Sequence, residues 1–332
     1  MKKSIYLICL IISVSFLISN SAQPGVWNAG GSGVFKLLYP KDSIAYKKIQ
    51  MKSENIFMQI YNGFATVKGN YYFKNTNKDT LTIKVGYPIN NVFENITHNN
   101  YANNVTVDGL YKIKGLINGQ AATLMKKPNE ENDNWYVWSI TFPPNKITKF
   151  TVYFLVNTNN AKITRGYNSN KKNAFIYLIE TGSLWKPPIE KGNFYTQLKD
   201  KILIHQIKSS SPTKLFFNKE NSTLKFSLFN YGKSPDSNFV ITYGEKLENF
   251  NFKEITKKSE SYFKTIDLYS NNNFNNFSYD EIKLPNVYKV DGISNGIIGF
   301  TMFIANYGLL FLFGIFLICF FSYYNKKRRL KK

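Results

Sequence analysis

The stretch ATVKGNYYFKNTNKDTLTIKVGY, residues 65–87, decides the fold class because most of its apolar side chains recur at every second position. This period over several residues is typical of a strand with one buried face. Residues 65–74 and 81–87 both follow the pattern, and the segment between them, Asn75-Thr76-Asn77-Lys78-Asp79, is polar. We therefore predict two antiparallel strands that the polar segment joins as a hairpin.

The same pattern recurs further along the chain. Residues 135–142 and 147–156 predict a second hairpin through Pro143-Pro144-Asn145. Short strands rich in aromatic and β-branched residues favour a mainly β fold. We predict an antiparallel immunoglobulin-like β-sandwich, formed as one large sandwich or as two packed ones. Further strands are expected at 174–180, 202–208, 223–229 and 238–243.

The strand pattern defines one region, residues 23–244, with a subdivision near residue 160 as an alternative. Residues 245–296 are rich in Asn and Lys and alternate more weakly, so we predict a stalk, or late strands followed by a linker. The sequence shows no long amphipathic helical pattern in either region. Helix is therefore expected to be minor.

The first 22 residues have the layout of a secretory signal peptide. Lys2 and Lys3 precede an apolar run at residues 5–18, and small polar residues follow it. Cleavage is expected after Ser21 or Ala22. An uncleaved N-terminal anchor is the alternative, although the apolar run is short for a membrane span.

A second apolar segment, residues 297–322, carries no charged side chain. At about 1.5 Å per residue it is long enough to cross a hydrocarbon core of about 30 Å, so we predict a transmembrane helix. The positive-inside rule places the basic tail at 323–332 in the cytoplasm. We therefore predict a single-pass type I protein of the cytoplasmic (inner) membrane with a periplasmic or extracellular ectodomain. The tail residues that set this topology are Lys326, Lys327, Arg328, Arg329, Lys331 and Lys332.

The net charge of +22 is unevenly distributed. The signal segment accounts for two of these charges and the tail for six, which leaves +14 on the body. A positive body attracts anionic polymers. However, only three of the 43 basic residues are arginines, and only Arg165 lies in the body, whereas planar phosphate recognition favours arginine. We therefore favour a solvated positive surface over specific polyanion recognition, and we expect no nucleic-acid partner.

Few residues of the body are suited to covalent or metal chemistry. Cys9 lies in the signal and Cys319 in the predicted span, so the body has no disulfide and no thiolate ligand. The two histidines, His98 and His205, are too few for a multi-histidine metal site, and His205 is expected to be structural on a strand face. The acidic loop at 130–133 is a weaker candidate for calcium. We predict no cofactor and no resident metal.

Two kinds of side chain keep alternative functions open. Glycosidase chemistry needs only two carboxylates, so an envelope hydrolase is retained as an alternative. Trp135 and Trp185 stand beside turn residues and are candidates for surface binding of a sugar or a peptide, because exposed aromatic rings supply a large contact area. Trp138 alternates with apolar neighbours and is expected in the core. The candidate acids are Glu54, Glu130, Glu180 and Glu190.

A group of segments between about residues 44 and 243 carries a resemblance to known proteins. These segments are residues 49–54, 65–67, 72–75, 85–88, 177–186, 229–236 and 241–243, together with Ile189. They resemble an uncharacterised family of extracytoplasmic, membrane-anchored bacterial proteins. The resemblance implies a β-rich fold with membrane or periplasmic residence. It carries no catalytic residue and no family-level function over to this chain.

The leading hypothesis is a membrane-anchored extracytoplasmic β-sandwich protein with a non-catalytic interaction or structural role in the cell envelope. Its expected partner is a protein or an envelope polymer. The alternatives are a carboxylate-dependent hydrolase and a carbohydrate- or peptide-binding module. The abundance of strand-forming side chains and the scarcity of catalytic ones favour the first hypothesis.

Overall fold

The computed structural model describes ten segments of the chain. The predicted signal, the acidic loop at 130–133 and the last three residues lie outside them. The chain forms two compact units. One contains Gly25–Ile163 and Ser169–Tyr288, and the other includes Lys289–Lys332. The described segments are residues 25–27, 30–33, 43–90, 112–125, 135–159, 161–165, 168–179, 185–231, 238–288 and 295–329.

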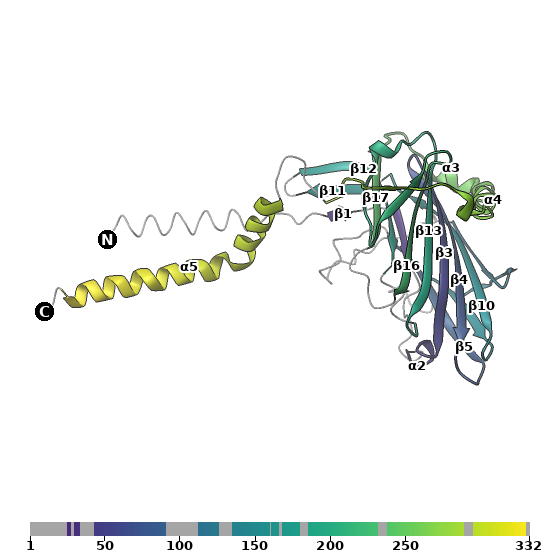
Figure 1. The fold of residues 1–332 in the computed structure, drawn as a ribbon, viewed down its shortest axis with the longest axis horizontal. Coiled ribbons are helices and arrows are strands. Elements are labelled where there is room, and N and C mark those ends of the chain that lie inside the picture. The colour runs from purple at the N-terminus through teal and green to yellow at the C-terminus, as the bar shows by residue number, and fades with distance from the viewer. Residues whose placement is uncertain are drawn as a thin grey trace. The chain divides into compact units, whose positions relative to one another are not determined.

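Two β-sheets form the larger unit (Figure 1). The strands of the first sheet, in spatial order, are β1 (Gly25–Trp27), β11 (Ala161–Arg165), β12 (Asn168–Leu178), β2 (Gly30–Gly33), β5 (Leu81–Asn90), β9 (Trp135–Phe142) and β8 (Leu124–Met125), with β17 (Phe239–Glu245) paired to β12 and β14 (Lys208–Ser210) paired to β17. The strands of the second sheet, in spatial order, are β18 (Asp280–Ile282), β15 (Leu215–Asn218), β16 (Thr223–Tyr231), β13 (Ile189–Leu198), β3 (Ile49–Tyr61), β4 (Phe64–Asn75), β10 (Ile147–Asn157), β6 (Lys112–Ile117) and β7 (Gln120–Ala121).

The structure confirms a mainly β fold, and both sheets are mixed. Strand β12 runs parallel to β2, and β13 runs parallel to β3, whereas neighbours such as β3 and β4 are antiparallel. An immunoglobulin-like sandwich is built from antiparallel sheets. The two parallel pairs depart from that arrangement, so the predicted antiparallel immunoglobulin-like sandwich is not confirmed.

The main hydrophobic core contains side chains from both sheets. Phe73 of β4 meets Phe142 of β9 with ring centroids 5.8 Å apart, and Phe226 of β16 lies 4.9 Å from Phe239 of β17. The alternation predicted for β4 is confirmed on this side, because Val67 and Phe73 have no exposed surface. The period-two pattern thus identifies the core face correctly.

Both predicted hairpins are wrong for the same reason. Strand β4 pairs with β3 and β10, whereas β5 pairs with β2 and β9, so the connection after Asn75 crosses from one sheet to the other. The connection between β9 and β10 crosses back. Asn145 donates its backbone N–H to the carbonyl of Asn75 (3.0 Å), and Asn75 Nδ2 donates to the carbonyl of Phe142 (2.8 Å), so the crossings lie side by side. Alternation predicts the buried face of a strand but not its pairing partner.

One hairpin that the sequence prediction did not include joins β3 to β4. Tyr61 pairs with Phe64, which leaves Asn62-Gly63 as a two-residue turn. Gly63 has a φ of +91°, in the region that favours glycine, and a Cβ at this position would lie 2.6 Å from the ring of Phe250. Glycine is therefore required here both by the backbone and by the packing.

Residues 246–288 form helices that the sequence prediction, a stalk or late strands followed by a linker, did not include. These helices are α3 (Phe252–Lys257), α4 (Ser259–Ser270) and the 3-10 helix η5 (Phe274–Asn276). The short β18 is the strand of this region. Figure 1 shows α3 and α4 beside the second sheet. Apolar side chains from these helices and the outward face of the sheet form a second core: Phe57, Tyr61, Phe64, Tyr153, Leu155, Tyr195, Phe252, Phe263, Ile266, Tyr269 and Phe274.

A polar contact fixes α4 on this face. Lys68 Nζ donates to Asp267 Oδ1 (2.7 Å) and to Ser270 Oγ (2.8 Å), and the hydroxyl of Tyr153 donates to the same Asp267 oxygen (2.7 Å). Because the lysine is largely buried, it needs these partners to offset its desolvation. The contact therefore sets the position of α4 over β4 and β10.

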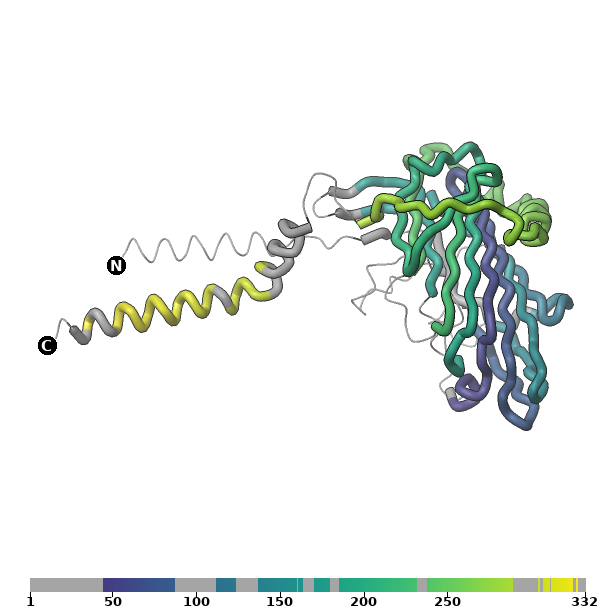
Figure 2. Tube along the Cα trace, in the orientation of Figure 1, coloured from purple at the N-terminus to yellow at the C-terminus, as the bar shows by residue number. Residues whose placement is uncertain are grey.

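Residues 277–288 form a strap that leads from the helices to the first sheet (Figure 2). Glu281 pairs with Phe216 at the edge of the second sheet, and Pro285 accepts a backbone hydrogen bond from Ser209 of β14 (2.9 Å). Val287 is then buried with Val240 in a third apolar cluster. The strap thus contacts both sheets.

Two short helices were not predicted from the sequence. These are α2 (Ser43–Tyr46) and the 3-10 helix η4 (Ile204–Gln206). The second lies where a strand was predicted at 202–208, and β14 begins only at Lys208. His205 is exposed on η4, so its predicted place on a strand face is wrong.

The smaller unit contains one long helix, α5 (Asn295–Arg329). Among the described residues this is the one helix long and apolar enough to cross a membrane, with Tyr307–Tyr324 as its candidate span. The apolar C-terminal helix predicted at 297–322 is confirmed as a helix. Lys327 is the tail residue whose exposed side chain is described.

Candidate functional site

Trp185 is buried, contrary to the prediction that it lies at the surface. It is 1% exposed, and its ring centroid lies 4.6 Å from that of Phe73 and 4.8 Å from that of Tyr46. The backbone N–H of Lys186 donates to the carbonyl of Ile49 (2.9 Å), and this bond holds the segment against the start of β3 with the indole turned inward. Trp138 is 1% exposed, which confirms its predicted place in the core.

Trp135 begins β9, but its side chain lies outside the described part of the structure. One of the two tryptophans proposed for surface binding is therefore buried, and the other stays a prediction. A binding surface built on this pair has lost half of its basis.

The two described candidate acids of the hydrolase alternative occupy different environments. Glu54 is fully buried between the sheets, whereas Glu190 is exposed and pairs with Lys52. They therefore do not form a shared pair of carboxylates in a cleft, which glycosidase chemistry requires. Glu130 and Glu180 lie outside the described residues. No group of three metal-binding side chains occurs in the described segments.

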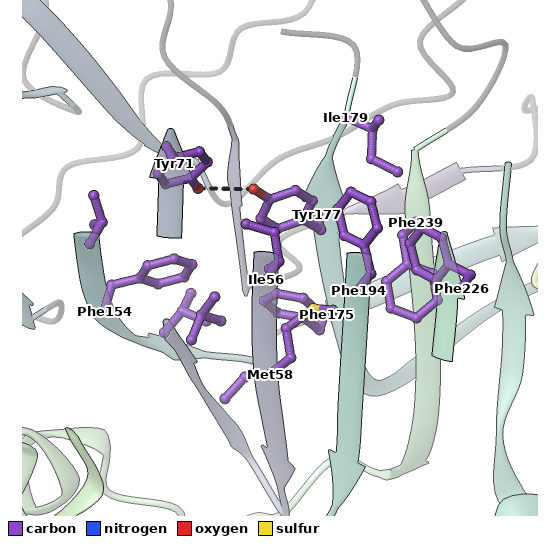
Figure 3. Packing of buried hydrophobic residues seen from close by; sticks show 14 of the residues in the cluster. Ile56, Met58, Tyr71, Phe154, Phe175, Tyr177, Ile179, Phe194, Phe226 and Phe239 are labelled. Carbon is purple, nitrogen blue, oxygen red and sulfur yellow. Dashed lines mark hydrogen bonds between the residues drawn. The ribbon is translucent and has the colours of Figure 1, made fainter. Parts of the chain in front are cut away.

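Glu54 is the centre of a hydrogen-bonded network inside the core. The hydroxyl of Tyr231 donates to Glu54 Oε1 (2.5 Å), and that of Tyr177 donates to Oε2 (3.3 Å). The hydroxyls of Tyr71 and Tyr177 lie 2.9 Å apart, and Figure 3 shows these two rings directed toward one another. We call these four residues the core tyrosine–acid network. It joins β3, β4 and β16 of the second sheet to β12 of the first.

An unusual backbone conformation brings Tyr231 to the acid. In β16 the odd-numbered residues, such as Phe229, face away from the core, so regular alternation would direct Tyr231 outward. Asn230 has a φ of +49°, and the register of β16 with β13 is the same on both sides of it, at Lys191–Phe229 and at Ile189–Tyr231. Asn tolerates this left-handed conformation better than most residues. The ring of Tyr231 consequently turns into the core.

Two strand glycines make room for the tyrosine rings. A Cβ at Gly192 would lie 2.2 Å from the hydroxyl of Tyr231, and a Cβ at Gly69 would lie 2.6 Å from that of Tyr71. Both distances are too short for any side chain. Glycine within a strand often marks such a close approach. These glycines are thus part of the network's construction.

Burial raises the pKa of Glu54 from 4.5 to about 7, and the hydrogen bonds from Tyr231 and Tyr177 lower it in part. Burial also raises the pKa of Tyr231 well above 10, and the neighbouring carboxyl raises it further. The tyrosine therefore remains a donor while Glu54 gains or loses a proton near neutral pH. Because Glu54 has no exposed surface, the network is suited to holding the sheets together and not to acting on a substrate.

The opposite face of the second sheet carries a row of polar side chains across five strands. Ser227 Oγ donates to Asn193 Oδ1 (3.0 Å), Asn193 Nδ2 donates to Asn55 Oδ1 (2.8 Å), and Thr151 Oγ1 donates to Asn70 Oδ1 (2.8 Å). Backbone register places Asn55 directly opposite Asn70. These five residues form the amide row. The next outward position on these strands is occupied by Phe57 and its partner Tyr195, which pack against the helices.

A second row lies next to the amide row, one step further from the helices. It contains Phe229, Lys191, Ser53, Tyr72 and Lys149 in register on five adjacent strands. Lys191 Nζ lies 5.7 Å from the ring centroid of Phe229, and Lys149 Nζ lies 5.7 Å from that of Tyr72. Phe229 is 64% exposed and Lys191 is also exposed. We call this the lysine–aromatic row, and the two rows together the outer strip.

Sequence reasoning missed both features, although each leaves a signal. Gly69 and Gly192 each stand two positions before a buried aromatic residue, Tyr71 and Phe194, and interior glycines indicate close packing. Asn is depleted in strands, so three asparagines at outward strand positions, Asn55, Asn70 and Asn193, are an unusual feature of this sheet face. Neither signal can be used until the pairing of the strands is known.

The comparisons with known proteins give no family. No protein-family model and no curated protein matches this chain. A crystal structure of a "putative nutrient binding protein" from Legionella pneumophila is 15% identical, covers 66% of this chain and 72% of its own, and has a TM-score of 0.43. Native yeast LTA4 hydrolase is 7% identical, covers 60% of this chain and 29% of its own, and has a TM-score of 0.34. Likenesses at this level carry no argument about function.

Proposed function

We propose that this protein is a membrane-anchored, extracytoplasmic binding protein with a non-catalytic role in the cell envelope. The outer strip carries this proposal, because it presents lysines, aromatic rings and side-chain amides on adjacent strands of one sheet. Aromatic rings supply contact area, and charged and amide groups supply directional hydrogen bonds. Such a surface suits recognition of an extended partner.

The proposed anchor is α5, with its candidate span at Tyr307–Tyr324. The basic residues that follow favour a cytoplasmic C-terminus and therefore place the β-rich unit on the other side of the membrane. A membrane-impermeant maleimide tests this topology on intact cells. Cysteine introduced at Lys264, which is exposed on α4, should react, whereas cysteine introduced at Lys327 should react only after lysis.

The binding role is tested by photo-crosslinking of the full-length protein in its native membranes. A photoreactive residue at Lys191, in the outer strip, is compared with one at Lys264, on the exposed side of α4. We expect a discrete crosslinked product from position 191 that position 264 does not give. Equal products from both positions, or none from either, would contradict the proposal.

A further inference from the structure

We propose that the outer strip binds an acidic polysaccharide, a chain of linked sugars that carry carboxylates. This inference rests on the proposed function and names the class of ligand. It departs from the expectation, drawn from charge and composition alone, of a solvated positive surface without specific polyanion recognition, because register gathers lysines and aromatic rings in one row. The chain would lie across the strands of the second sheet, along the two rows of side chains. Five adjacent strands at about 4.8 Å spacing offer a surface about 19 Å long between the outermost strand axes.

The charge of the strip fits an anionic ligand. Lys149 and Lys191 belong to the lysine–aromatic row, and Lys225 follows on β16 beyond the amide row. Burial lowers the pKa of Lys225, and the positive charge of Lys191 lowers it further, so the two ammonium groups lie close enough to repel one another. Glu190, at the margin of the strip, is already paired with Lys52. A ligand carboxylate near Lys191 and Lys225 would relieve their repulsion.

The aromatic rings favour a sugar polymer over a polymer of phosphates alone. Phe229 on β16 and Tyr72 on β4 lie three strands apart in the same row, or about 14 Å at ordinary strand spacing. Each ring has a lysine ammonium over it at 5.7 Å. A sugar ring has an apolar C–H face that packs on an aromatic ring, and a carboxylate on its edge that an adjacent lysine attracts. Both pairs therefore offer the same combination of contacts.

The half-buried members of the amide row, Asn55, Asn193 and Ser227, supply partners for neutral hydroxyl groups, whereas Asn70 and Thr151 are buried. The hydrogen bonds from Ser227 to Asn193 and from Asn193 to Asn55 fix the orientation of these side chains before a ligand arrives. Preorganised donors and acceptors reduce the entropy lost on binding. Nucleic acid fits less well, because planar phosphate recognition favours arginine and the cations of this strip are lysines.

The first experiment measures binding of the full-length protein in nanodiscs of zwitterionic lipid. The probes are polygalacturonate, neutral dextran, an oligothymidylate and vesicles of anionic phospholipid. We expect polygalacturonate to bind, with an affinity that falls as salt rises, and dextran not to bind. Equal or tighter binding of the oligothymidylate or the vesicles would overturn the choice of a polysaccharide.

Variants then locate the site. The pair Lys149→Gln and Lys191→Gln should weaken polygalacturonate binding about fivefold to tenfold. The matched control, Lys253→Gln with Lys264→Gln, removes the same charge from exposed positions on the helices and should bind as the wild type does. Equal weakening in both pairs would show a general charge effect and overturn the site.

Variants of Phe229 distinguish the contribution of ring stacking to binding from that of charge. Phe229→Ala should weaken binding about tenfold, and Phe229→Tyr should retain it, since the ring face is preserved. Unchanged binding in Phe229→Ala would contradict the proposed stacking. If polygalacturonate does not bind at all while position 191 still gives a discrete protein crosslink, the polysaccharide is excluded and the proposed binding role stands.

Discussion

Glu54 and Asn55 are neighbours on β3 that face opposite sides of the same sheet, and their polar side chains find hydrogen-bond partners in different ways. Glu54 points into the core, where tyrosine hydroxyls from other strands surround it. Asn55 points outward, where it belongs to a row of similar groups on adjacent strands. The inner arrangement depends on a few long-range contacts, whereas the outer one repeats a local contact from strand to strand. The inner side should therefore be more sensitive to change.

The largest expected effect is the pH dependence that Glu54 gives to stability. The pKa of its carboxyl is about 7 in the folded protein and 4.5 without burial, so the folded state holds a proton that the unfolded state releases between these values. Raising the pH from 4 to 8 should therefore lower the free energy of unfolding by about 3 kcal/mol through this group alone. Chemical denaturation of the full chain in detergent, followed by tryptophan fluorescence, measures this.

Glu54→Gln is the matched control for that measurement, because glutamine keeps the shape and cannot titrate. The difference in stability between wild type and Glu54→Gln should change in favour of the variant as pH rises from 4 to 8. A difference that stays constant over this range would show that Glu54 does not titrate between the folded and unfolded states as proposed.

The next effect comes from filling the space beside the network. Gly192→Ala places a methyl group where the hydroxyl of Tyr231 would be 2.2 Å away, so the tyrosine must move off Glu54. We expect a loss of about 2–3 kcal/mol of unfolding free energy. Gly314→Ala is the control, since a Cβ there meets no atom within 4 Å. Equal stability of the two variants would mean that Tyr231 can leave the acid at no cost.

A smaller effect is expected at the residue that turns Tyr231 inward. Asn230 has a φ of +49°, where alanine is less favourable than asparagine or glycine. Asn230→Ala should lower stability by about 1 kcal/mol, and Asn230→Gly should be close to wild type. Thermal unfolding of the three proteins in the same detergent tests the order. If both variants lose the same stability, the backbone conformation is not the cause.

The smallest effect is expected on the outer side of the strand. Asn55→Ala removes the acceptor of the 2.8 Å bond from Asn193 in a half-buried position, which should cost about 1 kcal/mol or less. Thr82→Ala, which removes an exposed threonine pair with Thr141, should cost still less. A loss for Asn55→Ala as large as that for Gly192→Ala would remove the contrast between the two faces.

The sequence predicts the strands and their buried faces well, because those depend on local alternation. Val67, Phe73 and Trp138 are all buried as expected. It fails on pairing, which depends on residues far apart: the segments after Asn75 and after Phe142 resemble hairpin turns but cross between sheets. One local signal was overlooked, since Asn62-Gly63 between two apolar runs predicts the hairpin of β3 and β4.

The candidate sites were less predictable than the fold. Residues 245–288 alternate weakly because their buried positions, including Phe252, Thr256, Phe263 and Ile266, recur at helical spacing. Trp185 stands beside prolines in the sequence, yet a bridge to the start of β3 turns it inward. Each row of the outer strip exists only because register aligns one residue from each of five strands, and single-sequence reasoning has no access to register.

The parallel pairing of β3 with β13 also affects how the chain is made. Position for position, the partners are separated by 138 residues, as for Asn55 and Asn193. A nascent chain can pair β3 with β4 as soon as both have emerged, but the other edge of β3 stays open until β13 has been synthesised. Open strand edges invite pairing with other chains. We therefore expect this edge to be accessible to other chains while the intervening residues are being added.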